Sequence, residues 1–220
     1  MSSSKRPATT RPAEIVREYA LEGADRVGGV THDGRQVWAA TGPALVAFDP
    51  ASGAAVRRIE QGADAGTAFD GKHLWQIAEQ RIAKIDPDSG RVLASIPAPG
   101  GGADSGLAWA EGSLWVGQYR GRKIHQVDPA SGAILRTIES DRFVTGVTWV
   151  DGELWHGTWE GDESELRHVD PADGAVLERL EMPAGVGVSG LESDGGDLFY
   201  CGGGHVGVVR AVRRPRKLAA

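Results

Sequence analysis

Residues Val127–Ile138 read VDPASGAILRTI, and this stretch decides the fold because nearly the same phrase occurs three more times. The other copies are FDPASGAAVRRI from Phe48, IDPDSGRVLASI from Ile85 and VDPADGAVLERL from Val169. In each copy Asp–Pro opens a turn, and the Gly four residues after the Asp can adopt the left-handed conformation. Apolar and polar residues alternate before and after the turn, which is the period of a strand. Each phrase therefore predicts two antiparallel strands joined by a tight turn.

A second recurrent piece precedes each phrase and has a constant distance from a Gly to an aromatic residue. Its five copies are GVTHDGRQVW from Gly29, GTAFDGKHLW from Gly66, GLAWAEGSLW from Gly106, GVTWVDGELW from Gly146 and GLESDGGDLF from Gly190. Asp–Gly or Glu–Gly in the middle again marks a hairpin turn. One unit thus contains four short strands in about 40 residues, the period of a β-propeller blade. We expect the aromatic residue of each copy to pack between neighbouring blades.

The fifth unit ends early, because its third strand, GVVRAVRRP, is followed by no Asp–Pro turn and no fourth strand. The N-terminal segment EIVREYALEG, from Glu14, has the pattern of the fourth strands. We therefore predict an all-β fold, a five-bladed propeller with four-stranded blades whose last blade is closed by the N-terminal strand. The predicted boundaries are a disordered tail over residues 1–12, a single propeller over 13–214 and a C-terminal tail over 215–220.

Composition limits the classes of partner. The 220 residues have a formal net charge of −6, which argues against nucleic acid as the main partner because phosphate binding needs a basic field. No apolar run approaches the ~20 residues of a membrane span, so no membrane partner is expected. The single cysteine, Cys201, and the lack of a secretory signal at the start favour a cytoplasmic location. The expected partner is a small-molecule ligand.

In a propeller the loops that enter the first strand, or join the second to the third, meet at one mouth of the central channel. The candidate site residues are therefore those just before each recurrent Gly and those in the variable loops. Before the Gly the chain carries Ser105, Thr145 and Ser189, which we expect to bind a ligand, and one step earlier Asp64 and Asp104. The two carboxylates can share a proton or hold a hard cation, or each can cap its own turn.

Glu192 is a further candidate, because it stands two residues after Gly190 at a position that is otherwise Thr or Ala. Its strand should line the channel. We therefore expect Glu192, Asp64 and Asp104 to serve as catalytic acid and base, or as ligands of a divalent cation such as Ca, Mg or Zn.

The variable loops add Tyr119, Arg120, Trp159 and His205 as candidate ligand-binding residues. Tyr119 and Trp159 can act as aromatic platforms for a small ligand. The loop that holds Arg120 and Arg122 is basic, and the loop that follows Trp159 is acidic, so simple ion pairing between the loops is the alternative interpretation.

The repeated Gly, Asp–Gly turn, Leu–Trp and DPxSG pattern resembles the small-molecule propellers that include plant-type glutaminyl cyclases, streptogramin B lyase and the gluconolactonase group. The resemblance covers residues about 14 to 214, and GVSGLESDGG is similar to the Asn–Glu–Leu–Glu segment of the cyclases, with Glu192 at its last Glu. It implies a channel-mouth site for a small molecule. The catalytic Glu of the cyclases has no counterpart at Ala65, so the resemblance does not name the reaction.

Three functions of different class remain open at this stage. The first is an enzyme with metal-assisted lyase, hydrolase or cyclase chemistry at the channel mouth. The second is a propeller that binds a small ligand at the same mouth without chemistry. The third is a protein-interaction propeller, a common use of repeat folds.

Overall fold

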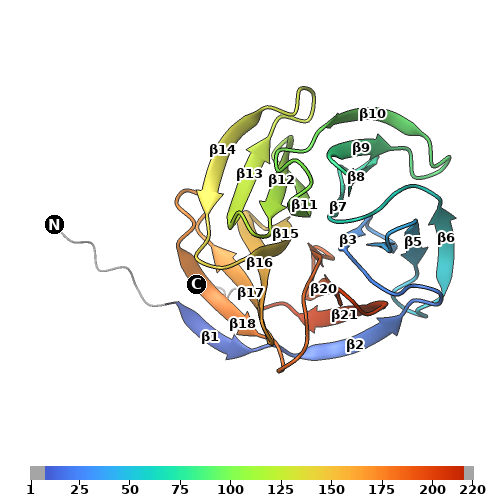
Figure 1. Cartoon of the computed structure of the whole chain (residues 1–220). Coiled ribbons are helices and arrows are strands. Elements are labelled where there is room, and N and C mark those ends of the chain that lie inside the picture. The colour runs from blue at the N-terminus through green and yellow to red at the C-terminus, as the bar shows by residue number, and fades with distance from the viewer. Residues whose placement is uncertain (1–7, 216–220) are drawn as a thin grey trace.

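The structure is a computed structural model that describes residues 8–215. The strands form five sheets, each with four adjacent antiparallel strands. The sheets surround a central axis, as Figure 1 shows. Every element between residues 8 and 215 is a strand, so the predicted all-β propeller with five blades is confirmed. No helix in this range is long and apolar enough to cross a membrane.

Blades 1 to 3 each use four strands that follow one another in the chain. Blade 1 contains β3 (Gly29–His32), β4 (Val37–Ala40), β5 (Leu45–Phe48) and β6 (Ala55–Ile59). Blade 2 contains β7 (Thr67–Phe69), β8 (Leu74–Ala78), β9 (Arg81–Ile85) and β10 (Val92–Pro97). Blade 3 contains β11 (Asp104–Ala110), β12 (Ser113–Gln118), β13 (Lys123–Val127) and β14 (Ile134–Glu139).

Blades 4 and 5 also take strands from the start of the chain. Blade 4 contains β15 (Val144–Val150), β16 (Glu153–Glu160), β17 (Glu163–Val169) and β18 (Val176–Glu181), with β1 (Thr9–Pro12) beyond β18. Blade 5 contains β19 (Leu191–Ser193), β20 (Leu198–Gly202), β21 (Val208–Arg213) and finally β2 (Ile15–Ala20).

The N-terminal strand closes the ring as predicted. β2 pairs antiparallel with β21, with Tyr19 opposite Val209. Tyr19 also crosses the seam, because its ring packs 4.8 Å from that of Phe48 and its hydroxyl donates to Pro50 O at 2.9 Å. Arg17 donates to the carbonyls of Pro50 and Ala51 at 3.0 and 2.7 Å. The closing strand therefore joins the last blade to the first.

The predicted disordered tail over residues 1–12 needs a correction. Residues 1–7 lie outside the described residues, but Thr9–Pro12 form β1, which pairs in parallel with the outer edge of β18. Arg11 Nε lies 3.0 Å from Glu178 Oε1 in this pairing. The equivalent residues of the other outer strands are Arg17, Arg57, Ala94 and Arg136. Blade 4 is thus the one blade with an acidic partner for Arg11 at this position. At the other end the structure describes the chain as far as Pro215.

The two recurrent turns satisfy their own polar groups. In the first Asp–Pro turn Asp49 Oδ1 accepts the Ala51 N–H at 2.8 Å, and the Gly53 N–H donates to Asp49 O at 2.7 Å. The Asp–Gly turns also serve the recurrent tryptophans, since Asp33 and Asp70 accept the indole N–H of Trp38 and Trp75. The carboxylates of these turns therefore stabilise the face of the ring opposite the channel mouth.

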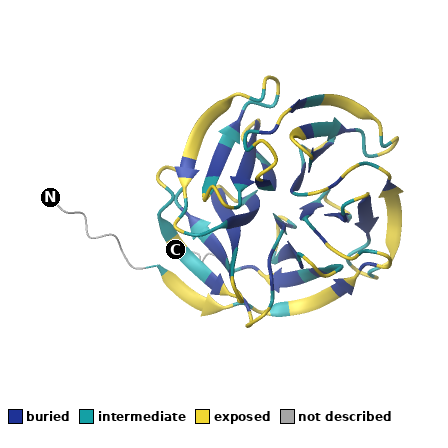
Figure 2. Ribbon diagram, viewed as in Figure 1, coloured by how far each residue is buried: buried dark blue, intermediate teal, exposed yellow. Residues whose placement is uncertain are grey.

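The recurrent aromatic residues pack between blades, as predicted. Trp75 stacks on Trp109 of blade 3, and Trp155 packs against Phe199 of blade 5. Figure 2 shows buried residues gathered on the inner strands and exposed residues along the outer ones. The aromatic residues therefore form the interior that holds the blades side by side.

The recurrent glycines lie where neighbouring inner strands approach most closely. A Cβ at any of them would lie less than 3.0 Å from the backbone of the next blade around the ring. The contacts run from Gly29 to Ala65, from Gly66 to Leu107, from Gly106 to Thr145, from Gly146 to Leu191 and from Gly190 to Val30. Because backbone cannot move aside as a side-chain tip can, these positions accept only Gly.

Gly146→Ala is therefore expected to lower the free energy of unfolding by about 1 to 3 kcal/mol or more, the cost of overpacking a close-packed interior. Gly62→Ala is the matched control, because its nearest neighbour would be Ala78 Cβ at 3.5 Å, an ordinary contact. Urea unfolding of both variants measures the difference. Equal stabilities would contradict the steric role of the recurrent Gly.

Deleting residues 1–20 is expected to lower the melting temperature strongly, because it removes β2, exposes the edge of β21 and takes Tyr19 from the core. Deleting residues 1–12 removes only β1, whose four residues are all exposed, and should cost much less. Calorimetry of the two truncated proteins tests the closure. An unchanged melting temperature after the longer deletion would show that β2 does not close the ring.

Candidate functional site

A cavity of about 240 Å³ lies at the mouth of the central channel. All five blades contribute to it, through the starts of their inner strands or the loops between their second and third strands. The lining residues are Arg26, Val27, Gly28, Asp64, Ala65, Asp104, Ser105, Tyr119, Thr145, Trp159, Ser189, Gly204 and His205. The structure thus brings together most of the residues that the repeat pattern predicts for the mouth.

Aromatic side chains form one wall of the cavity. The Tyr119 hydroxyl donates to Trp159 O at 2.9 Å, and the rings of Trp159 and His205 lie 5.6 Å apart. The Trp159 ring also packs tightly on Gly187, where a Cβ would lie 2.7 Å from it. Arg120, in contrast, is exposed and does not line the cavity. The wall therefore joins blades 3, 4 and 5.

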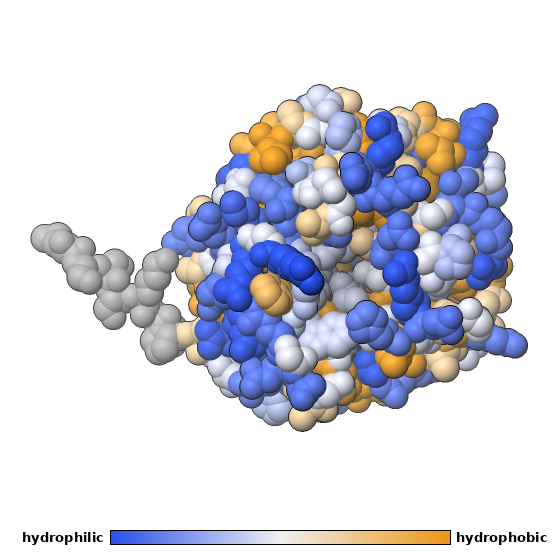
Figure 3. Space-filling model, viewed as in Figure 1, coloured by the Kyte–Doolittle hydropathy of each residue, from blue (hydrophilic) through white to orange (hydrophobic). Residues whose placement is uncertain are grey.

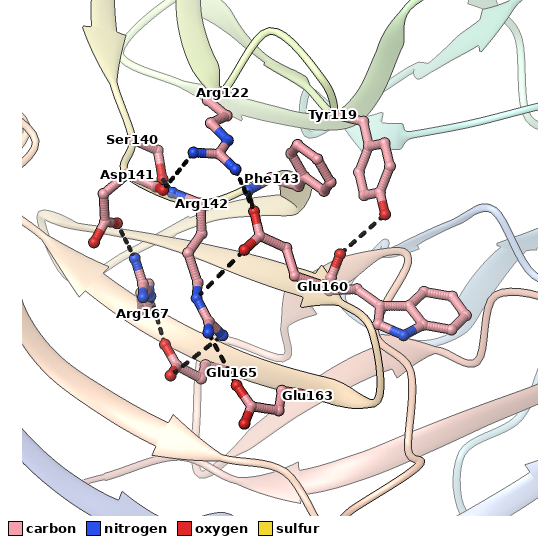
Figure 4. Close-up of polar contacts among 11 residues, drawn as sticks. Tyr119, Arg122, Ser140, Asp141, Arg142, Phe143, Glu160, Glu163, Glu165 and Arg167 are labelled. Atoms are coloured by element: carbon pink, nitrogen blue, oxygen red, sulfur yellow. Dashed lines mark hydrogen bonds and ion pairs between the residues drawn. The ribbon is translucent and has the colours of Figure 1, made fainter.

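A network of ion pairs lies behind this wall, as Figure 4 shows. Arg122 Nη2 lies 3.0 Å from Glu160 Oε1, which directly follows Trp159 in the chain. Arg142 lies 3.7 Å from Glu160 and 2.9 Å from Glu163. The predicted pairing between the basic and acidic loops is therefore present. It coexists with the aromatic wall, because the network holds the backbone next to Trp159 while the rings face the cavity.

The two mouth carboxylates differ in their surroundings. Asp64 is half-exposed at the rim, where its Oδ1 lies 3.1 Å from Arg26 Nη2 and its Oδ2 accepts the Glu79 N–H at 3.0 Å. Asp104 is buried, and both of its oxygens lie 3.0 Å from the Gly100 N–H. Burial raises the pKa of Asp104 above its usual value, although hydrogen bonds from Gly100 and Gln118 oppose the shift. Both carboxylates cap neighbouring loops, and both also line the cavity.

Three hydroxyls occupy the positions before the recurrent Gly in blades 3 to 5. Ser105 Oγ donates to Val144 O of the next blade at 2.7 Å. Ser189 Oγ donates to Val27 O of blade 1 and accepts the Gly204 N–H at 3.0 Å. Thr145 Oγ1 is buried and has no hydrogen-bond partner among the described residues. Of the three hydroxyls, that of blade 4 is therefore the one without a hydrogen bond to a neighbouring carbonyl.

Glu192 lies in the channel but does not line the mouth cavity. Its carboxylate accepts the hydroxyl of Thr31 at 2.9 Å and also that of Thr148. These residues belong to the two blades that flank blade 5, so Glu192 connects three inner strands. Desolvation by burial raises the pKa of Glu192 to about 7, although the hydrogen bonds from Thr148, Ser193 and Thr31 lower it.

The predicted cation set of Asp64, Asp104 and Glu192 does not come together. Glu192 lies apart from the other two carboxylates, and each of the three has its own hydrogen-bond donors. Between residues 8 and 215 no group of three or more His, Cys, Asp or Glu side chains is arranged to hold a metal ion. A divalent cation at the mouth stays a prediction, and these carboxylates do not supply it with a three-ligand site.

Arg26 is a cavity residue that the sequence reasoning missed. It stands three residues before Gly29, where the other blades carry Ala63, Ala103, Phe143 and Gly187. A charged residue at this otherwise small or apolar position was the available signal. Its side chain reaches Asp64 on the next blade.

The chain is thus a five-bladed β-propeller with a small cavity at the mouth of its central channel. No family model matches the sequence, and no curated protein matches it. Among solved structures, the chain is similar to Myxococcus xanthus glutaminyl cyclase, with a TM-score of 0.78 and 17% identity over 94% of this chain and 98% of that one. The resemblance in fold to a glutaminyl cyclase, expected from the repeats, is therefore confirmed.

Two other solved structures have lower TM-scores to this chain. Kuenenia stuttgartiensis hydrazine synthase has a TM-score of 0.51 and 16% identity, over 82% of this chain and 58% of that chain. The WD40 β-propeller domain of Doa1 has a TM-score of 0.55 and 15% identity, over 86% and 64%. At these identities the matches establish only the fold. The activity has to be inferred from the residues of the cavity.

The raised pKa of Glu192 predicts a pH-dependent stability. Since the folded protein holds this proton more tightly than the unfolded chain, the free energy of unfolding should fall as pH rises from about 4.5 to about 7 and then level off. Glu192→Gln should remove this fall and stabilise the protein at pH 8 by roughly 1 to 3 kcal/mol. Unfolding at pH 5 and pH 8 measures it. Glu111→Gln, which changes an exposed carboxylate, is the control, and identical pH profiles of both variants would contradict the assignment.

Proposed function

We propose that the protein acts on a small molecule held in the mouth cavity, with Asp104 as the acid and base of the reaction. The observation that carries this proposal is the convergence of all five blades on one cavity of about 240 Å³ that contains a buried carboxyl group and an aromatic wall. Concave sites with a few polar groups among apolar ones are typical of small-molecule binding.

Asp104 is the best-supported catalytic group. Its raised pKa brings the carboxyl group closer to the range in which it can both donate and accept a proton near neutral pH. The imidazole of His205 lines the same cavity and offers a second group for proton transfer. A thiol mechanism is not supported, because desolvation raises the pKa of Cys201 to about 12 and the thiol is buried.

The reaction class that these groups support is lyase, hydrolase or cyclase chemistry, which requires proton transfer but no redox cofactor. The similarity of fold to a glutaminyl cyclase is compatible with such a reaction. The step that the residues of this chain supply is the movement of a proton between Asp104 and a substrate atom, with Trp159 and Tyr119 holding the substrate body.

Binding without chemistry is the second candidate. It is favoured by the fact that Asp64 and Asp104 already accept backbone N–H groups and so have roles in holding the loops. In this case the same cavity would select a ligand through contacts with Tyr119 and Trp159, without a chemical step.

A protein-interaction role has weaker support. Seven exposed large aliphatic residues of the described chain lie on the outer strands. Five of them stand at one repeat position, one in each blade, and the other two stand directly before it in blades 2 and 3: Val16, Val56, Leu93, Leu135 and Leu177, then Val92 and Ile134. These residues are distributed around the outer circumference of the ring, so they do not form one continuous apolar face. The side seen in Figure 3 likewise has apolar residues in separate spots rather than in a continuous patch. Monomeric proteins commonly expose apolar residues in this scattered way.

A screen of lactones, cyclic peptides and N-glutaminyl peptides, read by thermal shift and by product formation, tests the proposal. Asp104→Asn should lose at least ~100-fold in turnover at saturating substrate, the usual contribution of a general acid or base. Asp88→Asn is the matched control, because this carboxylate is 92% exposed and belongs to an Asp–Pro turn. Turnover that survives in Asp104→Asn would reject the catalytic role, and ligands that bind Trp159→Ala with unchanged affinity would reject the site.

A further inference from the structure

The mouth cavity contains one carboxylate that no cation of the chain neutralises. Three of its lining side chains are Arg26, Asp64 and Asp104. Arg26 pairs with Asp64, so these two charges offset each other. Within the described part of the chain Asp104 forms no ion pair, and its donors are all neutral: the Gln118 amide and the backbone N–H groups of Gly100, Gly102 and Asp104 itself. In its ionised form Asp104 therefore gives the cavity an excess of one negative charge.

The burial of Asp104 strengthens the effect of its charge on ligand binding. The residue is only 8% exposed, and Coulomb attraction is several times stronger in such a site than in water. The raised pKa of Asp104 is consistent with this surplus, because it reflects a carboxylate whose desolvation is incompletely compensated. A cationic group of a ligand would supply the missing compensation.

The aromatic wall favours the same kind of ligand. Cations are attracted to the faces of Trp and Tyr rings, and the protein itself uses this attraction. Lys84 lies over Trp75, Arg136 over Trp115 and Arg122 over Phe143. Among the described residues no cation of the chain lies over Trp159, although its ring lines the cavity. Trp159 therefore lines the cavity without a cationic partner from the described chain.

We infer that the mouth cavity recognises a compact amine, whose ammonium group pairs with Asp104 while its apolar or aromatic body packs against Trp159 and Tyr119. The inference rests on the proposed function, since it uses the same cavity. The volume of about 240 Å³ lies below the ~300 Å³ at which sites for drug-sized ligands begin, which restricts the amine to a small molecule. An anionic ligand is disfavoured by Asp104.

Matched compounds test the charge requirement directly. Benzylamine and benzyl alcohol differ in charge at nearly the same shape, and phenylacetate provides the anion. Binding to the full chain is measured at pH 8 by isothermal titration calorimetry and by tryptophan fluorescence. Benzylamine should bind at least tenfold more tightly than benzyl alcohol, phenylacetate should bind most weakly, and the preference for the amine should decline as salt is added.

Three variants locate the effect. Asp104→Asn should reduce the tenfold preference for the amine to near unity, Trp159→Ala should weaken both compounds, and Asp88→Asn should leave both affinities unchanged. Melting temperatures identify a variant that has lost its fold, and in that case the comparison of compounds on the unmodified protein decides the inference alone.

The possible failures are distinguishable. If benzyl alcohol or phenylacetate binds as tightly as benzylamine and Trp159→Ala weakens that binding, the amine preference is wrong but the mouth remains the ligand site. If none of the three compounds binds at millimolar concentration, the inference is wrong, and the proposed function depends on the substrate screen. If benzylamine binds equally well to Asp104→Asn and Trp159→Ala, both the inference and the mouth site are contradicted.

Discussion

The close approach of five inner strands at five glycines is the constraint on which the rest of the structure depends. Each recurrent Gly brings its strand against the backbone of the next blade, from Gly29 around the ring to Gly190. Any side chain at these positions would force the blades apart. Because they remain close, Glu192 reaches Thr31 on one neighbouring blade and Thr148 on the other, and the starts of all five inner strands converge on one small cavity.

The two faces of the ring consequently have different roles. On the face of the recurrent turns, carboxylates such as Asp33 and Asp49 accept hydrogen bonds from the N–H groups of their own turns, and Asp33 also accepts one from an indole N–H group. On the mouth face the loops differ from blade to blade, and that variation supplies Asp104, Trp159 and His205. A site built on such a rigid frame has its side chains positioned before a ligand arrives, which reduces the entropy lost on binding.

Much of this arrangement could be predicted from the repeats, because turn chemistry and strand period are local properties. The blades, the closure by β2 and the convergence of Ser105, Tyr119 and Trp159 follow from that pattern. The strand β1 could not be predicted in this way, since it belongs to no repeat and pairs with β18, which is far away in the sequence. The repeat positions of Glu192 and Asp104 explain why the two carboxylates lie apart. Glu192 stands two residues after the recurrent Gly of its blade, and Asp104 stands two residues before that of its own blade. Four residues of extended strand span about 13 Å, so the two side chains lie at different depths in the channel.

A crystallographic fragment screen tests the central claim, that the mouth cavity is the site where the protein meets its ligand, most directly. The account predicts that bound fragments concentrate between Asp104 and Trp159, in contact with residues from several blades. Fragments that bind repeatedly at the outer rim or the turn face and leave this cavity empty would contradict it.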